Sequence, residues 1–183
     1  MGAATALDGE DDLATLRAAR QGDGDAATRL LRRHGASMLA TARHVLGRAG
    51  REEAEDAVQD ALIAAWSTDA LPSGDVGAWL RAIAVRKALD GRRRSRRLAE
   101  EPLPLEEREP PVTGKDALAG LALERAFRSL AAGDRAVLVL VEVEGLSMAE
   151  AARSLGTTTM AVKWRAVRAR RRLRALLTGS SDA

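Results

Sequence analysis

The chain has 183 residues, of which 30% are charged and only 2% are aromatic, and its formal net charge is +3. This length allows one or two small domains, and the scarcity of aromatic side chains excludes a large core built on them. The sequence contains no cysteine, which excludes disulfides, thiol nucleophiles and thiolate metal sites. Two scattered histidines, His34 and His44, do not suggest a metal centre, and we expect both on helix surfaces.

The charges are clustered along the chain, so local electric fields matter more than the net charge. Basic residues gather at 86–97 and 163–174, and acidic residues gather at 8–12, 52–60 and 100–109. No apolar run approaches the roughly 20 residues of a membrane-spanning helix. The N-terminus also lacks the charged-then-apolar pattern of a signal peptide. We therefore expect no membrane insertion and a cytoplasmic location.

The first of two predicted domains spans residues 19–98 and is expected to consist of helices. Residues 1–18 are acidic and rich in small side chains, and we expect them to be disordered or frayed. Beyond them, apolar residues recur at helical spacing and form one stripe. The stripe consists of Leu30, Leu31, Met38, Leu39, Ala42, Val45 and Leu46. The glycines at 47 and 50 mark its end.

A second helix is predicted over about 52–67, with two chemically different faces. Its apolar positions, which we expect in the core, are Val58, Ala61, Leu62 and Ala65. Its polar face carries Glu55, Asp56, Gln59 and Asp60. By itself this face is either a binding surface or a solvated acidic surface.

A loop containing proline and glycine follows at 67–77, and a third helix starts near Val76 and ends in the basic run. Trp79 has two candidate roles in this helix, as a core anchor or as a platform for base stacking. Its spacing with Leu80 and Ile83 favours the core anchor.

Residues 99–115 are predicted to form a flexible linker between two domains. This segment contains four prolines and several glutamates, so it lacks backbone donors and apolar side chains to bury. The second domain spans 116–178, and 179–183 form a tail. Helices are expected at about 118–130 and 133–144. The β-branched residues from 137 to 143 could also form a strand, but an isolated strand would lack a partner, so we predict an all-α fold.

The segment from Ser147 to Leu177 predicts a helix-turn-helix. Ser147 and Glu150 have the spacing of a capping box, in which each side chain accepts a hydrogen bond from the other's backbone N–H. Gly156 can adopt the left-handed conformation that ends a helix. Hydroxyls at 157–159 can then cap a second helix. Two helices with a short connection are the usual arrangement for binding in the major groove of DNA.

The second helix of this pair separates apolar from basic residues. One stripe, expected to pack inward, consists of Val162, Ala166, Ala169, Leu173 and Leu176. The opposite side carries Lys163, Trp164, Val167, Arg168, Arg171 and Arg174. Such a face suits phosphates and base edges. The alternatives are a solvated arginine-rich helix and a Trp164 that tucks into the core.

Three stretches, in this order and spacing, resemble the extracytoplasmic-function sigma factors of bacterial RNA polymerase. They are residues 53–60 followed by Trp66, residues 78–84 continuing to Arg97, and residues 144–173. These factors keep only regions 2 and 4 of the primary sigma factor. The resemblance implies two small helical domains, a region 2 bundle and a region 4 helix-turn-helix, joined by a flexible linker.

The resemblance also implies partners and residue roles. The partners are core RNA polymerase, through the clamp coiled coil of its largest subunit and the flap of the second largest, promoter DNA, and an anti-sigma factor that wedges between the domains. Polymerase contacts fall on Glu55, Asp56, Gln59 and Asp60. Contacts with the minus-ten element and the melted strand fall on Arg86, Lys87, Arg92, Arg93 and Arg94, with a base pocket in the 67–77 loop. Contacts with the minus-thirty-five element fall on Thr158, Thr159, Lys163, Trp164, Val167, Arg168 and Arg171.

The sequence departs from the family pattern at positions that affect specificity. Arg86 stands where relatives often have asparagine, and Trp164 stands where serine is common. A tryptophan adds apolar area and a donor but no acceptor. It could contact thymine methyl groups or sugars, or it could exclude the common upstream motif.

Two other functional classes share parts of this sequence pattern. A plain helix-turn-helix transcriptional regulator would use the same second helix but would not need the acidic helix at 52–67. A regulator that binds polymerase without initiating transcription is the third reading. No Ser/His/Asp set, phosphate-binding loop or metal-ligand spacing is present in the sequence, so we expect no enzymatic activity, catalytic residue, metal or cofactor.

Overall fold

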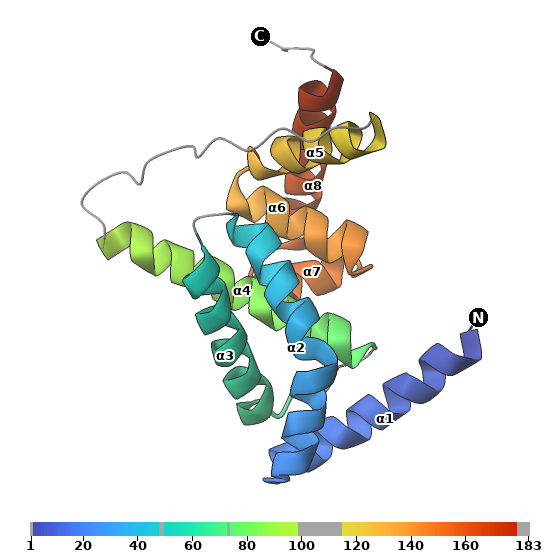
Figure 1. Ribbon diagram of the computed structural model, residues 1–183. Coiled ribbons are helices and arrows are strands. Elements are labelled where there is room, and N and C mark those ends of the chain that lie inside the picture. The colour runs from blue at the N-terminus through green and yellow to red at the C-terminus, as the bar shows by residue number, and fades with distance from the viewer. Residues whose placement is uncertain (1, 48–49, 73, 99–114, 179–183) are drawn as a thin grey trace.

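The computed structural model describes residues 2–47, 50–72, 74–98 and 115–178. These residues form helices and short connections without any strand, which confirms the predicted all-α fold (Figure 1). The elements are α1 (Gly2–Arg20), α2 (Gly24–Leu46), α3 (Arg51–Ser67), α4 (Val76–Leu98), α5 (Lys115–Arg128), α6 (Ala132–Leu138), a π-helical turn η1 (Val139–Val143), α7 (Met148–Leu155) and α8 (Thr159–Thr178). The predicted linker, except for Lys115, and the C-terminal tail lie outside the described residues.

Helices α2, α3 and α4 form the bundle of the N-terminal half, and α1 packs beside them. The Asp23 side chain caps α2 by accepting hydrogen bonds from the N–H groups of Asp25 and Ala26, at 2.9 and 3.0 Å. One core cluster unites Leu16, Leu30, Met38, Leu62 and Leu80 with smaller neighbours. The predicted apolar residues of α2 and α3 are buried or half-buried in the structure, apart from Leu31, whose side chain is exposed.

The N-terminal segment, which we expected to be disordered or frayed over residues 1–18, is helical from Gly2. It continues as α1 to Arg20, and the Leu16 side chain is completely buried. The Asp12 carboxylate lies 2.7 Å from Nε2 of His34 on α2, and both residues are buried. The expectation that His34 lies on a helix surface was therefore wrong. A short periodic pattern does not reveal an acid and a base 22 positions apart that are buried together.

The last turn of α1 is attached to two other helices through Arg20. Its Nε donates a 2.9 Å hydrogen bond to the carbonyl oxygen of Ala65 at the end of α3. The guanidinium also lies over the Trp79 ring, 5.6 Å from the ring centroid. Trp79 itself packs against the cluster around Leu80, which agrees with a core anchor.

In the C-terminal half, α6 continues directly into η1. The predicted helix over 133–144 is confirmed, because the buried valines at 137 and 139 pack on helices rather than pair in a sheet. The turn is wider than an α-helical turn, since the N–H of Glu144 donates to the carbonyl oxygen of Val139 at 2.9 Å. This widening places the Glu144 carboxylate beside the guanidinium of Arg81 and 3.2 Å from Oγ1 of Thr41.

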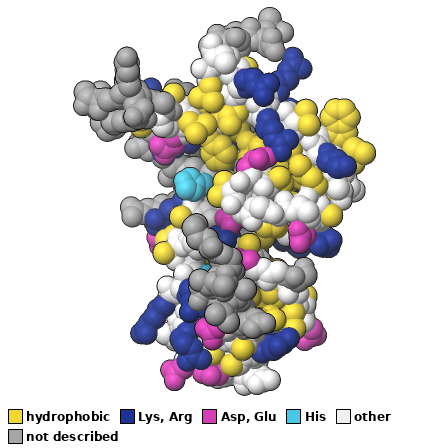
Figure 2. Space-filling model, turned by 90° about the vertical axis from the view of Figure 1, so that its right-hand side faces the viewer, with side chains coloured by type: hydrophobic (Ala, Val, Ile, Leu, Met, Phe, Trp, Pro, Cys, Tyr) yellow, Lys and Arg dark blue, Asp and Glu magenta, His cyan; other side chains and the backbone are white. Residues whose placement is uncertain are grey.

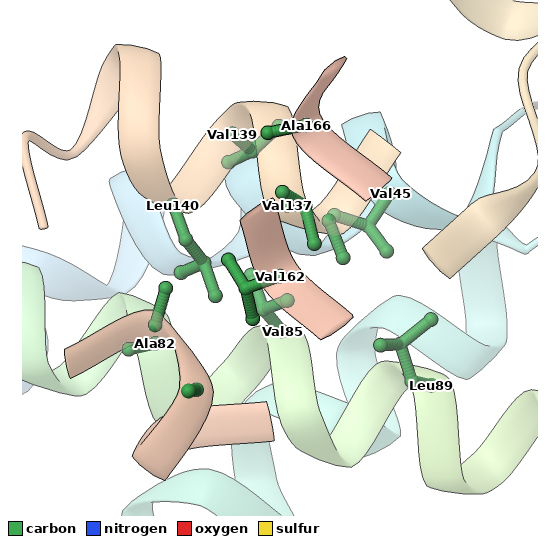
Figure 3. Close-up of a cluster of buried hydrophobic side chains, with 12 residues drawn as sticks. Val45, Ala82, Val85, Leu89, Val137, Val139, Leu140, Val162 and Ala166 are labelled. Atoms are coloured by element: carbon green, nitrogen blue, oxygen red, sulfur yellow. The ribbon is translucent and has the colours of Figure 1, made fainter. Parts of the chain in front are cut away.

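The two halves share one hydrophobic core. Figure 3 shows side chains from both halves meeting: Val45 and Val85 come from the N-terminal half, and Val137, Leu140 and Val162 come from the C-terminal half. Each of these five side chains is completely buried. The sequence predicted two domains and a linker but not this interface, through which α4 lies against α7 (Figure 1).

Candidate nucleic-acid and polymerase interfaces

The helix-turn-helix has the predicted caps. Ser147 Oγ accepts from the N–H of Glu150 at 3.2 Å, and the Glu150 carboxylate accepts from the N–H of Ser147 at 2.9 Å. This reciprocal hydrogen bonding lowers the pKa of the Glu150 carboxyl. Gly156 ends α7 in the left-handed conformation, with φ of 61°. Thr158 then caps α8 by accepting from the N–H of Ala161 at 3.1 Å.

Helix α8 divides into a buried and an exposed side, as its sequence pattern predicts. Val162, Ala166 and Ala169 are completely buried, and Leu173 packs against a smaller cluster. Leu176 is 45% exposed, so the predicted inward stripe stops one turn early. The positions predicted to contact the minus-thirty-five element all lie on the exposed side: Thr158, Thr159, Lys163, Trp164, Val167, Arg168 and Arg171.

Two large apolar residues, Trp164 and Met160, lie on this exposed side. The Trp164 side chain is 69% exposed, so it does not tuck into the core. Met160, one turn earlier, is 61% exposed; it stands where the family often has a small residue, but it was not among the predicted contacts with the minus-thirty-five element. Its spacing of four residues from Trp164 is the signal that would have found it.

Arg168 is oriented by a carboxylate on another helix. Its Nη2 lies 2.7 Å from Oδ1 of Asp134 on α6, and its Nε lies 3.3 Å from Oδ2. Asp134 is buried, and this pairing raises the pKa of Arg168. Arg170 is paired in a similar way with Glu142 of η1, through Nε at 3.0 Å. Both pairs attach α8 to the segment that precedes the helix-turn-helix.

The basic end of α4 forms a second exposed surface. Arg86, Arg93 and Arg94 have side chains that are 54%, 62% and 70% exposed. Their charges are partly balanced by Asp90, which lies 3.3 Å from Arg93, and by Asp60 of α3, which lies 3.7 Å from Arg94. An open hollow of about 400 Å³ is lined by Asp60, Lys87, Asp90, Arg93, Arg94 and Arg97.

Arg92 does not join this surface fully, although it belongs to the same run. Its Nη1 donates a 2.9 Å hydrogen bond to the carbonyl oxygen of Leu46, the last residue of α2. Carbonyl groups at a helix C-terminus carry partial negative charge, which a guanidinium stabilises. The Arg92 guanidinium therefore stabilises the packing of α4 against the end of α2.

The acidic face of α3 lies on the surface, as predicted. Glu55, Asp56 and Gln59 are exposed, and Asp60 is half-buried. Glu55 lies 3.1 Å from Nη2 of Arg43 in a solvent-exposed ion pair. Ile63, one turn after Gln59, is 60% exposed and adds an apolar group that sequence reasoning missed. The predicted polymerase and DNA surfaces meet where Asp60 approaches Arg94.

Within the described ranges, no group of three or more acidic, histidine or cysteine side chains is placed to hold a metal ion. No helix in the described part of the chain has the length and apolar character needed to cross a membrane.

Two protein families match the chain, one in each half. The family described as Sigma-70 region 2 matches residues 30–98, and the family described as Sigma-70, region 4 matches residues 120–173. The first match covers most of α2, α3 and α4, and the second covers α6 to α7 with most of α5 and α8.

Similar proteins and structures extend these matches over more than nine tenths of the chain. The ECF RNA polymerase sigma factor SigM of Mycobacterium tuberculosis H37Rv is 37% identical over 170 residues, which cover 91% of this chain and 84% of SigM. The RNA polymerase sigma factor NccH of Alcaligenes xylosoxydans xylosoxydans is 34% identical, over 92% of this chain and 96% of NccH. The solved structure of CnrH in complex with the cytosolic domain of CnrY matches with a TM-score of 0.57 and 32% identity, over 93% of this chain and 99% of that one.

Proposed function

The chain belongs to the sigma-70 family, in the group of extracytoplasmic-function RNA polymerase sigma factors, and we propose that its three exposed faces divide the work of initiation. An alternative sigma factor directs core polymerase to promoters. The observation that carries the proposal is the position of these faces. The acidic face of α3, the basic end of α4 and the exposed side of α8 are three surfaces of different charge and polarity on one chain, and the first two meet at Asp60 and Arg94.

We assign the minus-thirty-five element to α8. Its N-terminal end follows the short turn at Gly156, as in helices that enter the major groove. Lys163 and Arg171 supply cations for phosphates, and Trp164 and Val167 present apolar area between them. Arg168 contributes from a fixed position, because Asp134 orients its guanidinium.

We assign the minus-ten element and the melted strand to α4 and to the loop before it. Arg86, Lys87, Arg93 and Arg94 would hold phosphates, since cation contacts give affinity that does not depend on sequence. Flipping a base out of the duplex costs a few kcal/mol, which contacts in a pocket must offset. The loop at 67–77 is our candidate for that pocket.

We assign polymerase docking to the acidic face of α3. Glu55, Asp56 and Gln59 would meet basic and polar groups of the clamp coiled coil, and exposed charge pairs of this kind steer association and set orientation. The C-terminal half would meet the flap of the second largest subunit, as the family resemblance implies. Because a sigma factor acts by binding, we assign no catalytic residue or cofactor and expect it to act in the cytoplasm with the polymerase.

A protein partner is also part of the proposal. CnrH is bound to the cytosolic domain of CnrY in its solved structure, and this supports a comparable inhibitory partner, an anti-sigma factor, for this chain. Such a partner would block initiation by wedging between the two halves, as the family resemblance implies, or by covering the α3 face or one of the two DNA-binding faces.

Run-off transcription with purified bacterial core polymerase and sheared genomic DNA, with and without this protein, tests the proposed function. We expect discrete new RNA starts that share two upstream sequence motifs. Stable binding to core without new starts would favour a polymerase regulator that does not initiate. No binding to core would favour a plain helix-turn-helix regulator.

A further inference from the structure

The exposed side of α8 carries an apolar strip that nothing in the described chain covers. Met160, Trp164 and Val167 are 61%, 69% and 56% exposed. Their spacing of four and three residues puts them in one line along the first two turns of the helix. Large exposed apolar side chains in one continuous patch mark an interaction site more often than singly scattered ones do. We therefore treat the strip formed by Met160, Trp164 and Val167 as a binding surface for another molecule.

Charged groups along the strip identify the kind of occupant. Counted around the helix at 3.6 residues per turn, Lys163 and Arg170 lie on one side of the strip and Arg168 lies on the other. Arg168 and Arg170 are directed by Asp134 and Glu142. Figure 2 shows Lys and Arg side chains interspersed with hydrophobic ones over the upper part of its face, where the C-terminal helices lie. An apolar strip between two rows of cationic side chains complements the major groove of DNA. Base edges form the floor of that groove, and the two phosphate backbones form its walls.

The chemical groups on the floor of the major groove indicate which bases the apolar strip can contact. In the major groove, the thymine C5-methyl is the apolar group that a base pair offers, and guanine, adenine and cytosine present donors and acceptors there. The Val167 side chain cannot hydrogen-bond to those polar edges, the Met160 sulfur is only a weak acceptor, and the Trp164 side chain has a single donor and no acceptor. Polar base edges under the strip would lose water without gaining partners, which costs free energy.

We propose that Met160, Trp164 and Val167 select thymines in the minus-thirty-five element through their C5-methyl groups. This proposed preference for thymine rests on the proposed function of α8, which is to bind the minus-thirty-five element. It predicts an upstream motif that contains thymine at the positions under the first two turns of α8. Lys163 and Arg168 fix the register of the helix on the phosphates, and the strip supplies the choice of base.

The test removes the methyl group alone. Holoenzyme assembled from this protein and core polymerase selects binding sites from a random duplex library. Each thymine of the selected upstream motif is then replaced by deoxyuridine, which differs only in lacking the C5-methyl. We expect at least one replacement to weaken binding about fourfold, which is the value of one buried methyl group.

A double-mutant cycle assigns the effect to the strip. In Trp164→Ala or Val167→Ala holoenzyme, the corresponding deoxyuridine replacement should have no further effect, because the methyl has lost its contact. Leu123→Ala is the matched control, since Leu123 is an exposed apolar residue of α5, 47% exposed, outside the strip. That variant should keep the wild-type response to deoxyuridine.

Two results would overturn the inference while leaving the sigma function intact. One is efficient initiation from a selected promoter whose upstream motif contains no thymine. The other is a deoxyuridine effect that is equal in wild-type and Trp164→Ala holoenzyme. Absence of both sequence selection and initiation would instead contradict the proposed function itself.

Discussion

Arg135 of α6 donates hydrogen bonds from Nε and Nη2 to the carbonyl oxygen of Val45 in the last turn of α2, at 2.8 and 2.6 Å. Its Nη1 donates to the carbonyl oxygens of Arg128 and Leu130, at 2.7 and 2.6 Å. The side chain is buried, and burial, with a smaller effect of Arg92, lowers its pKa to about 10. A buried cation of the C-terminal half thus caps a helix of the N-terminal half. This polar contact joins the two halves inside an apolar core.

Replacing Arg135 by methionine should lower the free energy of unfolding by about 3 kcal/mol, because three backbone carbonyls lose their donors inside a buried site. Urea denaturation of the full chain measures this loss. Arg32→Met is the control, since Arg32 is exposed on α2 and should change stability by less than about 0.5 kcal/mol. Equal losses for both variants would show that the Arg135 contacts add nothing.

Two glycines of α4 should respond in opposite directions to the same substitution. A Cβ on Gly77 would lie 2.9 Å from Nδ1 of His34, whose ring Asp12 holds in place, and we expect Gly77→Ala to cost about 1–3 kcal/mol. A Cβ on Gly91 would meet nothing within 4 Å, and Gly91→Ala should stabilise by about 0.5–1 kcal/mol through helix propensity. Thermal unfolding of the two variants measures both signs. A stabilising Gly77→Ala would contradict the close packing of His34.

The capping box of α7 should make stability depend on pH in a defined window. The folded-state pKa of Glu150 is lowered from 4.5, so the cap stabilises the fold above that value and loses its effect as the pH falls through the folded-state pKa. Ser147→Ala should cost about 1 kcal/mol near neutral pH. The difference between wild type and this variant should be constant well above pH 4.5 and should shrink as the pH falls below that value and through the lowered folded-state pKa of Glu150. A difference that grows on acidification would refute the linkage.

Arg168 should affect both stability and DNA binding, and a second variant separates the two roles. Arg168→Ala leaves Asp134 buried without its partner, so it should destabilise the fold as well as weaken binding at the upstream element. Asp134→Asn keeps the Arg168 guanidinium but removes the charge that orients it, so it should reduce stability and should weaken DNA binding less than Arg168→Ala does. We would compare denaturation midpoints with holoenzyme affinity for promoters that contain or lack the upstream motif. Similar affinity losses for the two variants would argue against direct DNA contact by Arg168.

Charge reversal on α3 should separate polymerase docking from DNA binding. Asp56→Arg combined with Gln59→Arg should weaken binding to core polymerase by about tenfold or more, because like charges would oppose each other in the complex. Asp25→Arg, which reverses an exposed carboxylate on α2, is the matched control. Fluorescence anisotropy of the labelled chain with core measures both. An equal effect of the control would reduce the result to non-specific electrostatics.

Local patterns predicted most of the helices and the exposed face of α8. The capping box at Ser147 and the buried steps from Val162 to Ala169 follow from hydrogen bonds and periodicity within a few residues. The pairing of Arg135 with Val45 joins positions 90 residues apart, and it depends on how the two halves meet. The burial of His34 depends in the same way on a distant carboxylate, Asp12. Sequence spacing carries no information about such contacts.

The π-helical turn η1 sets the angular register of the helix-turn-helix relative to the N-terminal bundle. An α-helical turn over the same residues would rotate everything that follows by about 100°, because the wide turn holds one residue more than an α-helical turn at nearly the same total rotation. Glu144 would then turn away from Arg81 and Thr41, its partners on α4 and α2. A change in the hydrogen bonding of this one turn would therefore alter the fit between the two halves, although no apolar side chain of the shared core had been replaced.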